Sequence, residues 1–156
     1  MNNYNQDMVR LANKEEAEEI YQLVTRAFEK YGQNIEQTMH LEETLSEVIA
    51  DIEDHLVLVL EKKGQLVATL RLEQKEKNIF LLRRFAVDPD FQGHGYGSLL
   101  FQAAENLVKK KGGKKIYLFS SLENNRLVKF YQKLNFNCSQ INTEKGYHRG
   151  LWEKKL

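Results

Sequence analysis

The sequence predicts an α+β fold, in which a mixed, mostly antiparallel sheet of about seven strands is flanked by about four helices. The main observation is that short apolar runs with strand periodicity alternate with longer segments whose apolar residues recur at helical spacing. The composition adds to this, because 42% hydrophobic and 29% charged residues in a chain of 156 are typical of a globular protein. We therefore expect a single domain over residues 1–156.

Residues 8–52 predict one strand and two helices. Met8–Ala12 alternates apolar and polar residues over a short length, as an edge strand does. Asn13 is a favourable N-cap, and apolar residues follow it at helical spacing. We expect a helix from Lys14 to about Lys30 that ends at Gly32. A second helix is expected over Ile35–Ile52, where apolar residues again share one face.

Three strands are predicted next. His55–Leu60 is an almost continuous apolar run, which indicates a buried strand. The turn at Gly64 makes Gln65–Leu72 its hairpin partner. Ile79–Val87 is the third strand, and it must end before Pro89, because proline has no N–H to donate to a sheet.

The remainder of the chain predicts a helix, a strand, a second helix and two short strands. Gly97–Lys111 is amphipathic, Lys115–Ser120 reads as a strand, and Asn125–Leu134 as a helix. Phe136–Leu156 contains the two short strands. The buried stripe of the first helix is expected at Leu100, Ala103, Ala104 and Leu107.

Charge and cysteine content exclude several classes of function. Lys and Arg number 23 against 22 Asp and Glu, so a net charge of +1 provides no basic field for nucleic acid or an anionic membrane. The single cysteine, Cys138, cannot form an internal disulfide, and the four histidines lack metal-binding spacing, so we expect no metal. No long apolar segment or N-terminal signal region is present, so we expect a cytoplasmic protein.

Three glycines, Gly93, Gly95 and Gly97, lie within five residues between a predicted strand and a predicted helix. Free N–H groups and the positive end of the helix dipole meet at such a junction, which suits a phosphate. A P-loop is excluded because no Lys follows these glycines, and a dinucleotide fingerprint would need glycine where Ser98 stands. A tight turn without a ligand is the structural alternative.

Two motifs in this half of the chain resemble those of the GNAT superfamily of acyl-CoA N-acyltransferases. VDPDFQGHGYGSLL over Val87–Leu100 is similar to the acetyl-CoA-binding pattern V-x-P-x-x-[RQ]-x-x-G-x-[GA]. NNRLVKFYQKLNF over Asn124–Phe136 is similar to N-x-x-A-x-x-F-Y-x-K-x-G-F. It departs from that pattern at Leu127, where a small residue is common, and at Asn135, where glycine is common.

The resemblance implies that acetyl-CoA is the cosubstrate and that its acetyl group passes to a primary amine of a small molecule or peptide by direct attack. A non-catalytic module of the same fold that binds CoA or acyl-CoA is the alternative. Neither nucleic acid nor a membrane is an expected partner, and we expect a monomer or a homodimer.

The resemblance also implies a role for each matching residue. Backbone pairing with the pantetheine arm is expected at Phe85, Ala86 and Val87. Backbone N–H groups are expected to bind the pyrophosphate at Gln92, Gly93, His94, Gly95, Tyr96, Gly97 and Ser98. Asn124 and Tyr131 are both implied to contact the cofactor, Asn124 at the pantetheine and Tyr131 near the sulfur. Tyr131 is implied to be the general acid for the departing thiolate.

The general base is less evident. Residues 79–87 contain no Asp or Glu, so Glu73, at the end of the preceding strand, is the nearest candidate. A solvated charge at a strand end is the alternative for Glu73, and a water chain would also serve as the base. A covalent route through Cys138 is possible in principle, but a buried structural thiol is the better interpretation.

Arg83 and Arg84 are candidate substrate-binding residues. Consecutive strand residues face opposite ways, so we expect one to point toward the cleft and one away from it. An arginine in the cleft would bind a carboxylate or phosphate on the acceptor. An ion pair with Glu73 or Glu61 is the alternative.

Overall fold

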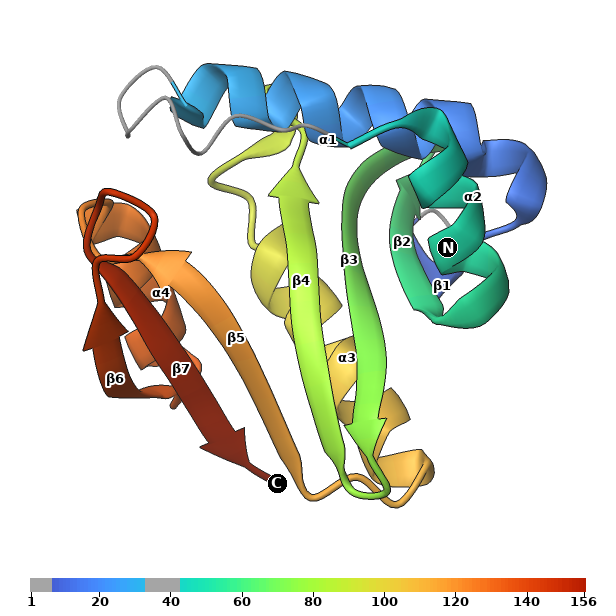
Figure 1. The fold of residues 1–156 in the computed structure, drawn as a ribbon. Coiled ribbons are helices and arrows are strands. Elements are labelled where there is room, and N and C mark those ends of the chain that lie inside the picture. The colour runs from blue at the N-terminus through green and yellow to red at the C-terminus, as the bar shows by residue number, and fades with distance from the viewer. Residues whose placement is uncertain (1–6, 33–42) are drawn as a thin grey trace.

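The computed structural model of the protein describes residues 7–32 and 43–156. These residues form seven strands in one sheet, in the order β1-β2-β3-β4-β5-β7-β6 (Figure 1). Neighbouring strands run antiparallel except β4 and β5, which run parallel. The strands are β1 (Asp7–Leu11), β2 (Leu56–Lys62), β3 (Gln65–Glu76), β4 (Ile79–Val87), β5 (Lys115–Ser121), β6 (Asn137–Asn142) and β7 (Arg149–Lys155).

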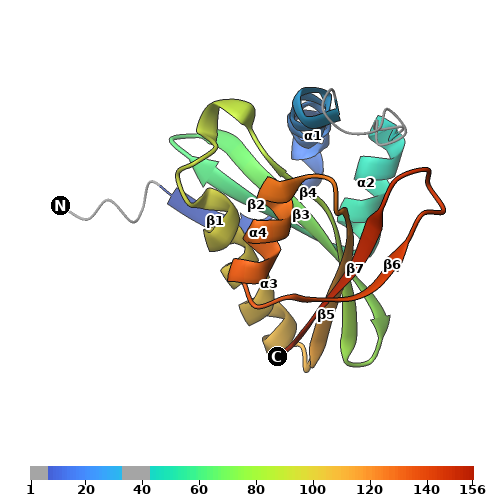
Figure 2. The same cartoon turned by 90° about the vertical axis from the view of Figure 1, so that its left-hand side faces the viewer.

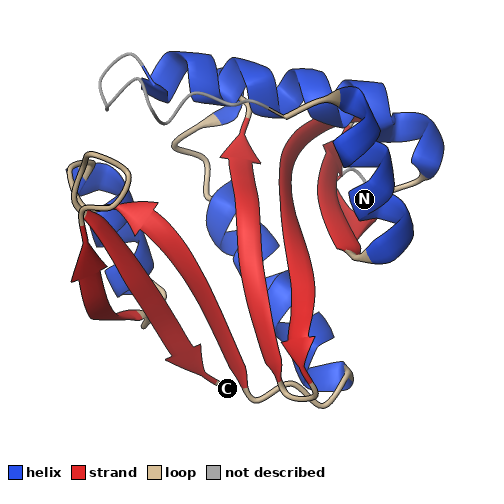
Figure 3. Ribbon diagram, viewed as in Figure 1, coloured by secondary structure: helices blue, strands red, loops and turns tan. Residues whose placement is uncertain are grey.

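Helices cover both faces of the sheet (Figures 2 and 3). Side chains that alternate along one strand separate the core into two clusters. Val57 and Val59 pack with two helices, α1 (Ala17–Gly32) and α2 (Leu45–Asp54), on one face. Leu58 and Leu60 pack with α3 (Tyr96–Lys110) on the other face. The helices of the described chain are α1 (Ala17–Gly32), α2 (Leu45–Asp54), α3 (Tyr96–Lys110) and α4 (Asn125–Lys133), with short 3-10 turns η2 (Lys14–Glu16) and η4 (Pro89–Phe91). None of these helices is both long and apolar enough to cross a membrane.

The predicted fold class and order of elements are confirmed, and β4 has the predicted bounds. The predicted start of the second helix is wrong within the described chain, because α2 begins at Leu45 and residues 43–44 precede it. Thr44 sets this start by accepting a hydrogen bond from Glu47 N at 3.2 Å, a capping contact that the spacing of apolar residues does not reveal. Residues 35–42 of that prediction lie outside the described residues.

The buried stripe of α3 also differs from the prediction. The helix fully buries Phe101 and Val108 where the pattern predicted Ala103 and Leu107, which are partly buried. The other two predicted residues are buried as expected. Phe101 meets the ring of Phe85 on β4 edge to face, with ring centroids 4.8 Å apart. The aromatic contact gives this side of the helix more apolar area to bury.

Strands β4 and β5 separate after a short paired stretch. Ile79–Leu81 pairs with Lys115–Tyr117 at one end of the two strands. Beyond it, β4 stays with β3 as far as Val87, and β5 stays with β7. Within the described chain, the edge of β4 that faces β5 therefore lacks a strand partner after Leu81, and its backbone polar groups remain available.

Strand β4 carries a bulge in its second half. Between the pairs Thr69–Ala86 and Arg71–Arg83, one residue of β3 opposes two residues of β4. Arg84, inside the bulge, has a φ of +56°, a left-handed conformation that few residues other than glycine adopt. A bulge of this kind changes the direction in which the following side chains point.

A group of ion pairs lies between this part of the sheet and α2. Arg71, whose side chain is fully buried, pairs with Glu43 and, at 2.8 Å, with Asp51. Arg83 makes two hydrogen bonds to Asp51, of 2.8 and 2.9 Å, and Arg84 lies 3.6 Å from Glu43. Both Arg83 and Arg84 therefore have their acidic partners on the α2 side of the sheet. The expectation that they point opposite ways is wrong, because the bulge interrupts the alternation.

Arg71→Met tests how much these ion pairs contribute to the free energy of unfolding. Without Arg71, the buried carboxylate of Glu43 loses the partner that hydrogen-bonds both of its oxygens, so we expect the free energy of unfolding to fall by about 3–5 kcal/mol. Lys14→Met is the control, because the Lys14–Glu53 pair is exposed and should contribute little to stability. Urea denaturation of both variants makes the comparison, and equal losses would contradict the expectation.

Candidate active site

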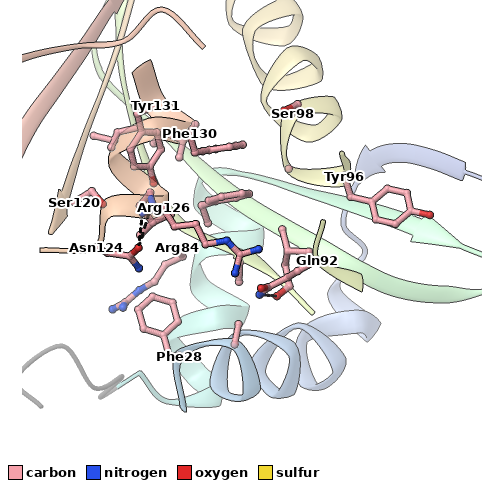
Figure 4. Close-up of a pocket in the computed structure, with 18 of the residues that line it drawn as sticks. Phe28, Arg84, Gln92, Tyr96, Ser98, Ser120, Asn124, Arg126, Phe130 and Tyr131 are labelled. Carbon is pink, nitrogen blue, oxygen red and sulfur yellow. Dashed lines mark hydrogen bonds between the residues drawn. The ribbon is translucent and has the colours of Figure 1, made fainter. Parts of the chain in front are cut away.

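A cavity of about 490 Å³ lies where β4 and β5 separate (Figure 4). Its described walls come from residues 82–87 of β4, residues 118–120 of β5, most of residues 91–98 before and at the start of α3, residues 124–133 along α4, and the second half of α1. The cavity therefore follows the unpaired edge of β4.

The glycine segment forms one part of the wall. Gly95 is the N-cap of α3 and has a φ of +82°, as does Gly93, a conformation that glycine adopts without strain. The first hydrogen bond of the helix runs from Leu99 N to Gly95 O at 3.1 Å. The N–H groups of residues 96–98 therefore have no helical acceptor, and with the helix dipole they form a site for an anion.

Two residues of this segment, Gly97 and Gln92, also make contacts that hold its shape. A Cβ atom on Gly97 would lie 3.0 Å from Phe85 and 3.2 Å from Phe130, so this glycine allows α3 to pack closely against both rings. Gln92 donates through Nε2 to the carbonyl of Val87 at 3.3 Å, so its amide closes the loop onto the strand. These two contacts hold the segment in the shape that presents its backbone N–H groups.

The three β4 residues predicted to pair with a ligand, Phe85–Val87, all line the cavity. The ring of Phe85 stacks on Phe130 of α4 with centroids 5.4 Å apart and planes 5° apart. This contact, together with the one to Phe101, fixes the bulged part of the strand between α3 and α4.

Helix α4 provides the opposite wall. Asn124 is its N-cap, and its Oδ1 accepts hydrogen bonds from the backbone N–H groups of Arg126 and Leu127, at 3.1 and 3.2 Å. The amide nitrogen of Asn124 can therefore donate toward the cavity that the residue lines. Leu127 also lines the cavity, so its side chain occupies space there that a smaller residue would leave open. Asn135 has a φ of +68°, the left-handed conformation that a helix C-terminus requires, and so replaces glycine without changing the turn.

Tyr131 lines the cavity although it is only 5% exposed. The rings of Trp152 and Phe136 surround it, with centroids at 5.7 and 6.2 Å. Burial raises the pKa of Tyr131 to about 12, and a hydrogen bond with Ser120 opposes this effect. The phenol therefore keeps its proton at neutral pH, as a proton donor must.

Glu73, Cys138 and His94 do not belong to the described lining of the cavity. Glu73 hydrogen-bonds Lys75 at 3.1 Å and Arg83 at 3.2 Å, and these cations, Lys75 first, hold its pKa below the usual range. Cys138 is exposed on the edge strand β6, so the interpretation as a buried thiol is wrong. Among the described residues, no group of three or more His, Cys, Asp or Glu is placed to hold a metal ion.

Sequence patterns did not single out four residues that the fold brings to the cavity: Phe28, Phe119, Ser120 and Arg126. Phe28 belongs to the apolar face of α1, where it reads as an ordinary core residue. Phe119 is 39% exposed on β5. Because Leu118 is buried, the alternation of the strand predicts an exposed position at Phe119, and an aromatic residue there indicates a functional surface. Ser120 and Arg126 carry no local signal.

The buried phenol predicts a stability change at alkaline pH. The unfolded chain ionises Tyr131 near pH 10, whereas the folded protein does so near 12, so stability is complete below pH 10 and falls as the pH rises toward 12. Between about pH 9 and about pH 11, the free energy of unfolding should fall by about 1 kcal/mol more in wild type than in Tyr131→Phe. Urea denaturation at both pH values measures this, and equal losses would show that the phenol is not buried.

Comparison with known proteins agrees with this architecture. The model of the acetyltransferase (GNAT) family matches residues 17–136. The chain is 31% identical over 108 residues to S-alkylcysteine N-acetyltransferase from Bacillus subtilis, covering 65% of this chain and 61% of that protein. It is 30% identical over 67 residues to an uncharacterized N-acetyltransferase from Methanocaldococcus jannaschii, covering 43% and 30%. The matches thus span less than two thirds of either relative.

Among solved structures, PaiA N-acetyltransferase from Thermoplasma acidophilum in complex with coenzyme A has the same fold. The TM-score is 0.86 at 20% identity, over 96% of this chain and 99% of that chain. The family match extends from α1 to the end of the segment that follows α4, and so includes the glycine segment, the open edge of β4 and Tyr131. The chain therefore belongs to the GNAT acetyltransferase family.

Proposed function

We propose that the protein is an N-acetyltransferase that transfers the acetyl group of acetyl-CoA to a primary amine of a small molecule or peptide. The observation that carries this proposal is that one cavity joins an anion site at a helix N-terminus, an unpaired strand edge and a protonated tyrosine. These features match the pyrophosphate, the amide-bearing pantetheine arm and the thioester of acetyl-CoA. Family membership and the coenzyme A complex of the Thermoplasma protein support the choice of cofactor.

In this proposal the cofactor is held mainly by backbone groups. The N–H groups of residues 93–98 bind the pyrophosphate, and Gln92 keeps their loop in place. The pantetheine amides pair with Phe85–Val87 as an added strand would. Asn124 donates its amide to a pantetheine carbonyl.

The proposed chemistry is direct transfer. The lone pair of a neutral amine attacks the thioester carbonyl carbon, forming the C–N bond, while a backbone N–H on the open edge of β4 polarises the carbonyl oxygen. The C–S bond then breaks, and Tyr131 gives its phenolic proton to the departing sulfur. The amine loses one proton to water, and water returns a proton to Tyr131, leaving an N-acetylated product and free CoA.

We assign the base to water in the cavity rather than to Glu73. Two hydrogen-bonded cations lower the pKa of Glu73, and its side chain is not part of the described lining. Cys138 is likewise outside the lining, so the proposal has no covalent step on the enzyme. The acceptor in the name of the Bacillus relative, S-alkylcysteine, has a primary amine, which supports the acceptor class.

Gly95→Asp tests the phosphate site. The new carboxylate would face the pyrophosphate, so we expect the dissociation constant for acetyl-CoA to rise by about 100-fold or more, the loss of one or two charge-assisted hydrogen bonds. Gly64→Asp is a matched control, because Gly64 has nearly the same φ, +81°, and similarly open surroundings, but lies in the β2–β3 turn. Isothermal titration should show a loss of affinity for Gly95→Asp alone; normal binding by that variant would contradict the site.

Tyr131→Phe tests the proton donor. We expect kcat to fall by about 100-fold, a typical contribution of a general acid, with little change in the KM for acetyl-CoA. Tyr117→Phe is the control, since Tyr117 lies on β5 outside the described lining. Release of the CoA thiol in the presence of amines measures the rate. An unchanged kcat would remove Tyr131 from the mechanism, and no thiol release by wild type would favour the non-catalytic CoA-binding module.

A further inference from the structure

The charged residues in the described lining of the cavity are all basic. The described lining contains no Asp or Glu, and its charged residues are Arg83, Arg84, Arg126 and Lys133. Arg126 and Lys133 are exposed on α4, where water screens their charges. The two arginines of β4 are more enclosed, and they differ in how far acidic residues neutralise them.

Arg83 has its charge satisfied by the protein. Its two terminal nitrogens bind both oxygens of Asp51, at 2.8 and 2.9 Å, and its Nε lies 3.2 Å from Glu73. These hydrogen bonds, those of Asp51 first in effect, raise its pKa although burial lowers it. A substrate that used Arg83 would have to break these pairs, so Arg83 is a structural residue here.

Arg84 is in the opposite situation. Its acidic partner in the described chain is Glu43, 3.6 Å from Nε, which is longer than a hydrogen bond. Both oxygens of Glu43 already accept hydrogen bonds from Arg71. Within residues 7–32 and 43–156, the terminal nitrogens of Arg84 have no hydrogen-bond acceptor, although the side chain is only 34% exposed. Burial lowers the pKa of Arg84, which reflects the same shortage of compensating charge.

The strained backbone gives Arg84 its position. The left-handed φ of +56° is strained for a residue with a side chain, and such strain is concentrated at functional sites. The bulge places the guanidinium on the α2 side of the sheet while the residue still lines the cavity. Figure 4 shows Arg84 and Phe28 among the residues around the cavity. Phe28 and the exposed ring of Phe119 add apolar surface to the same lining.

We propose that the acceptor is a free amino acid with an apolar side chain, and that Arg84 binds its carboxylate. This proposal rests on the N-acetyltransferase function proposed above. The planar guanidinium matches a carboxylate through two parallel hydrogen bonds, and Phe28 and Phe119 bind the apolar side chain. Polyamines are poor acceptors, because their second cation would meet Arg84 with no acidic residue in the described lining to compensate it.

The test measures equilibrium binding to the CoA-saturated protein by calorimetry, separately from turnover. The probes are L-methionine and L-phenylalanine, their carboxamides, which keep the amine and side chain but lose the negative charge, and spermidine. Wild type should bind each acid at least about 10-fold more tightly than its amide, as expected for a charge-assisted pair. Arg84→Gln should remove this preference, Arg84→Lys should restore part of it, and the affinity for CoA should not change.

Arg10→Gln is the matched control, because Arg10 pairs with Glu16 and Glu61 outside the described lining, so it should keep the preference for the acid. Tighter binding of the amides or of spermidine, binding of none of the probes, or a preference that survives Arg84→Gln would overturn the proposal. The transfer reaction is then followed with acetyl-CoA. Acids that bind through Arg84 without being acetylated would contradict the proposed function, but not the role of Arg84.

Discussion

Strand β4 pairs fully with one neighbour and only briefly with the other, and the rest of the site depends on this constraint. Its hydrogen bonds to β3 hold it in the sheet as far as Val87, whereas its pairing with β5 ends at Leu81. A cavity lies along the freed edge, and α3, which begins soon after β4 ends, has its N-terminus at the same place. The unpaired backbone groups of β4 and the free N–H groups at the start of α3 therefore face the same cavity.

Packing on both sides of β4 keeps this edge in place. On one side, the rings of Phe85, Phe101 and Phe130 pack against one another. Gly97 allows α3 to lie close to Phe85 and Phe130. On the other side, ion pairs of Arg71 on β3 and Arg83 on β4 with Glu43 and Asp51 tie α2 and the residues before it to the sheet. Buried ion pairs stabilise less than apolar packing of equal volume, but they fix which side chains meet. Here they satisfy Arg83 and leave Arg84 with an incomplete set of partners.

Features encoded by neighbouring residues were predictable from the sequence. The bounds of β4 and the glycine turn follow from apolar runs, a proline and closely spaced glycines. The bulge was not predictable, because Arg84 takes a left-handed conformation without the glycine or asparagine that usually marks one. The places of Phe28 and Phe119 in the cavity lining were not predictable either, because these residues come from α1 and β5 and meet only in the folded chain. Glu73 is close to β4 in the sequence, but its hydrogen bonds with Lys75 and Arg83 hold it outside the described lining of the cavity.

The placement of the open edge has a consequence for self-association. A strand edge with unpaired N–H and C=O groups is a template for strands of other molecules, and proteins usually shield such edges. In this sheet the open edge is internal, and β5 and α4 stand opposite it as walls of the cavity. The outer edge at β6 carries a bulge and polar residues such as Asn137 and Gln140, features that discourage strand addition. The protein thereby keeps this strand edge accessible to a slender ligand, while β5 and α4 hinder a strand of another molecule from pairing with it.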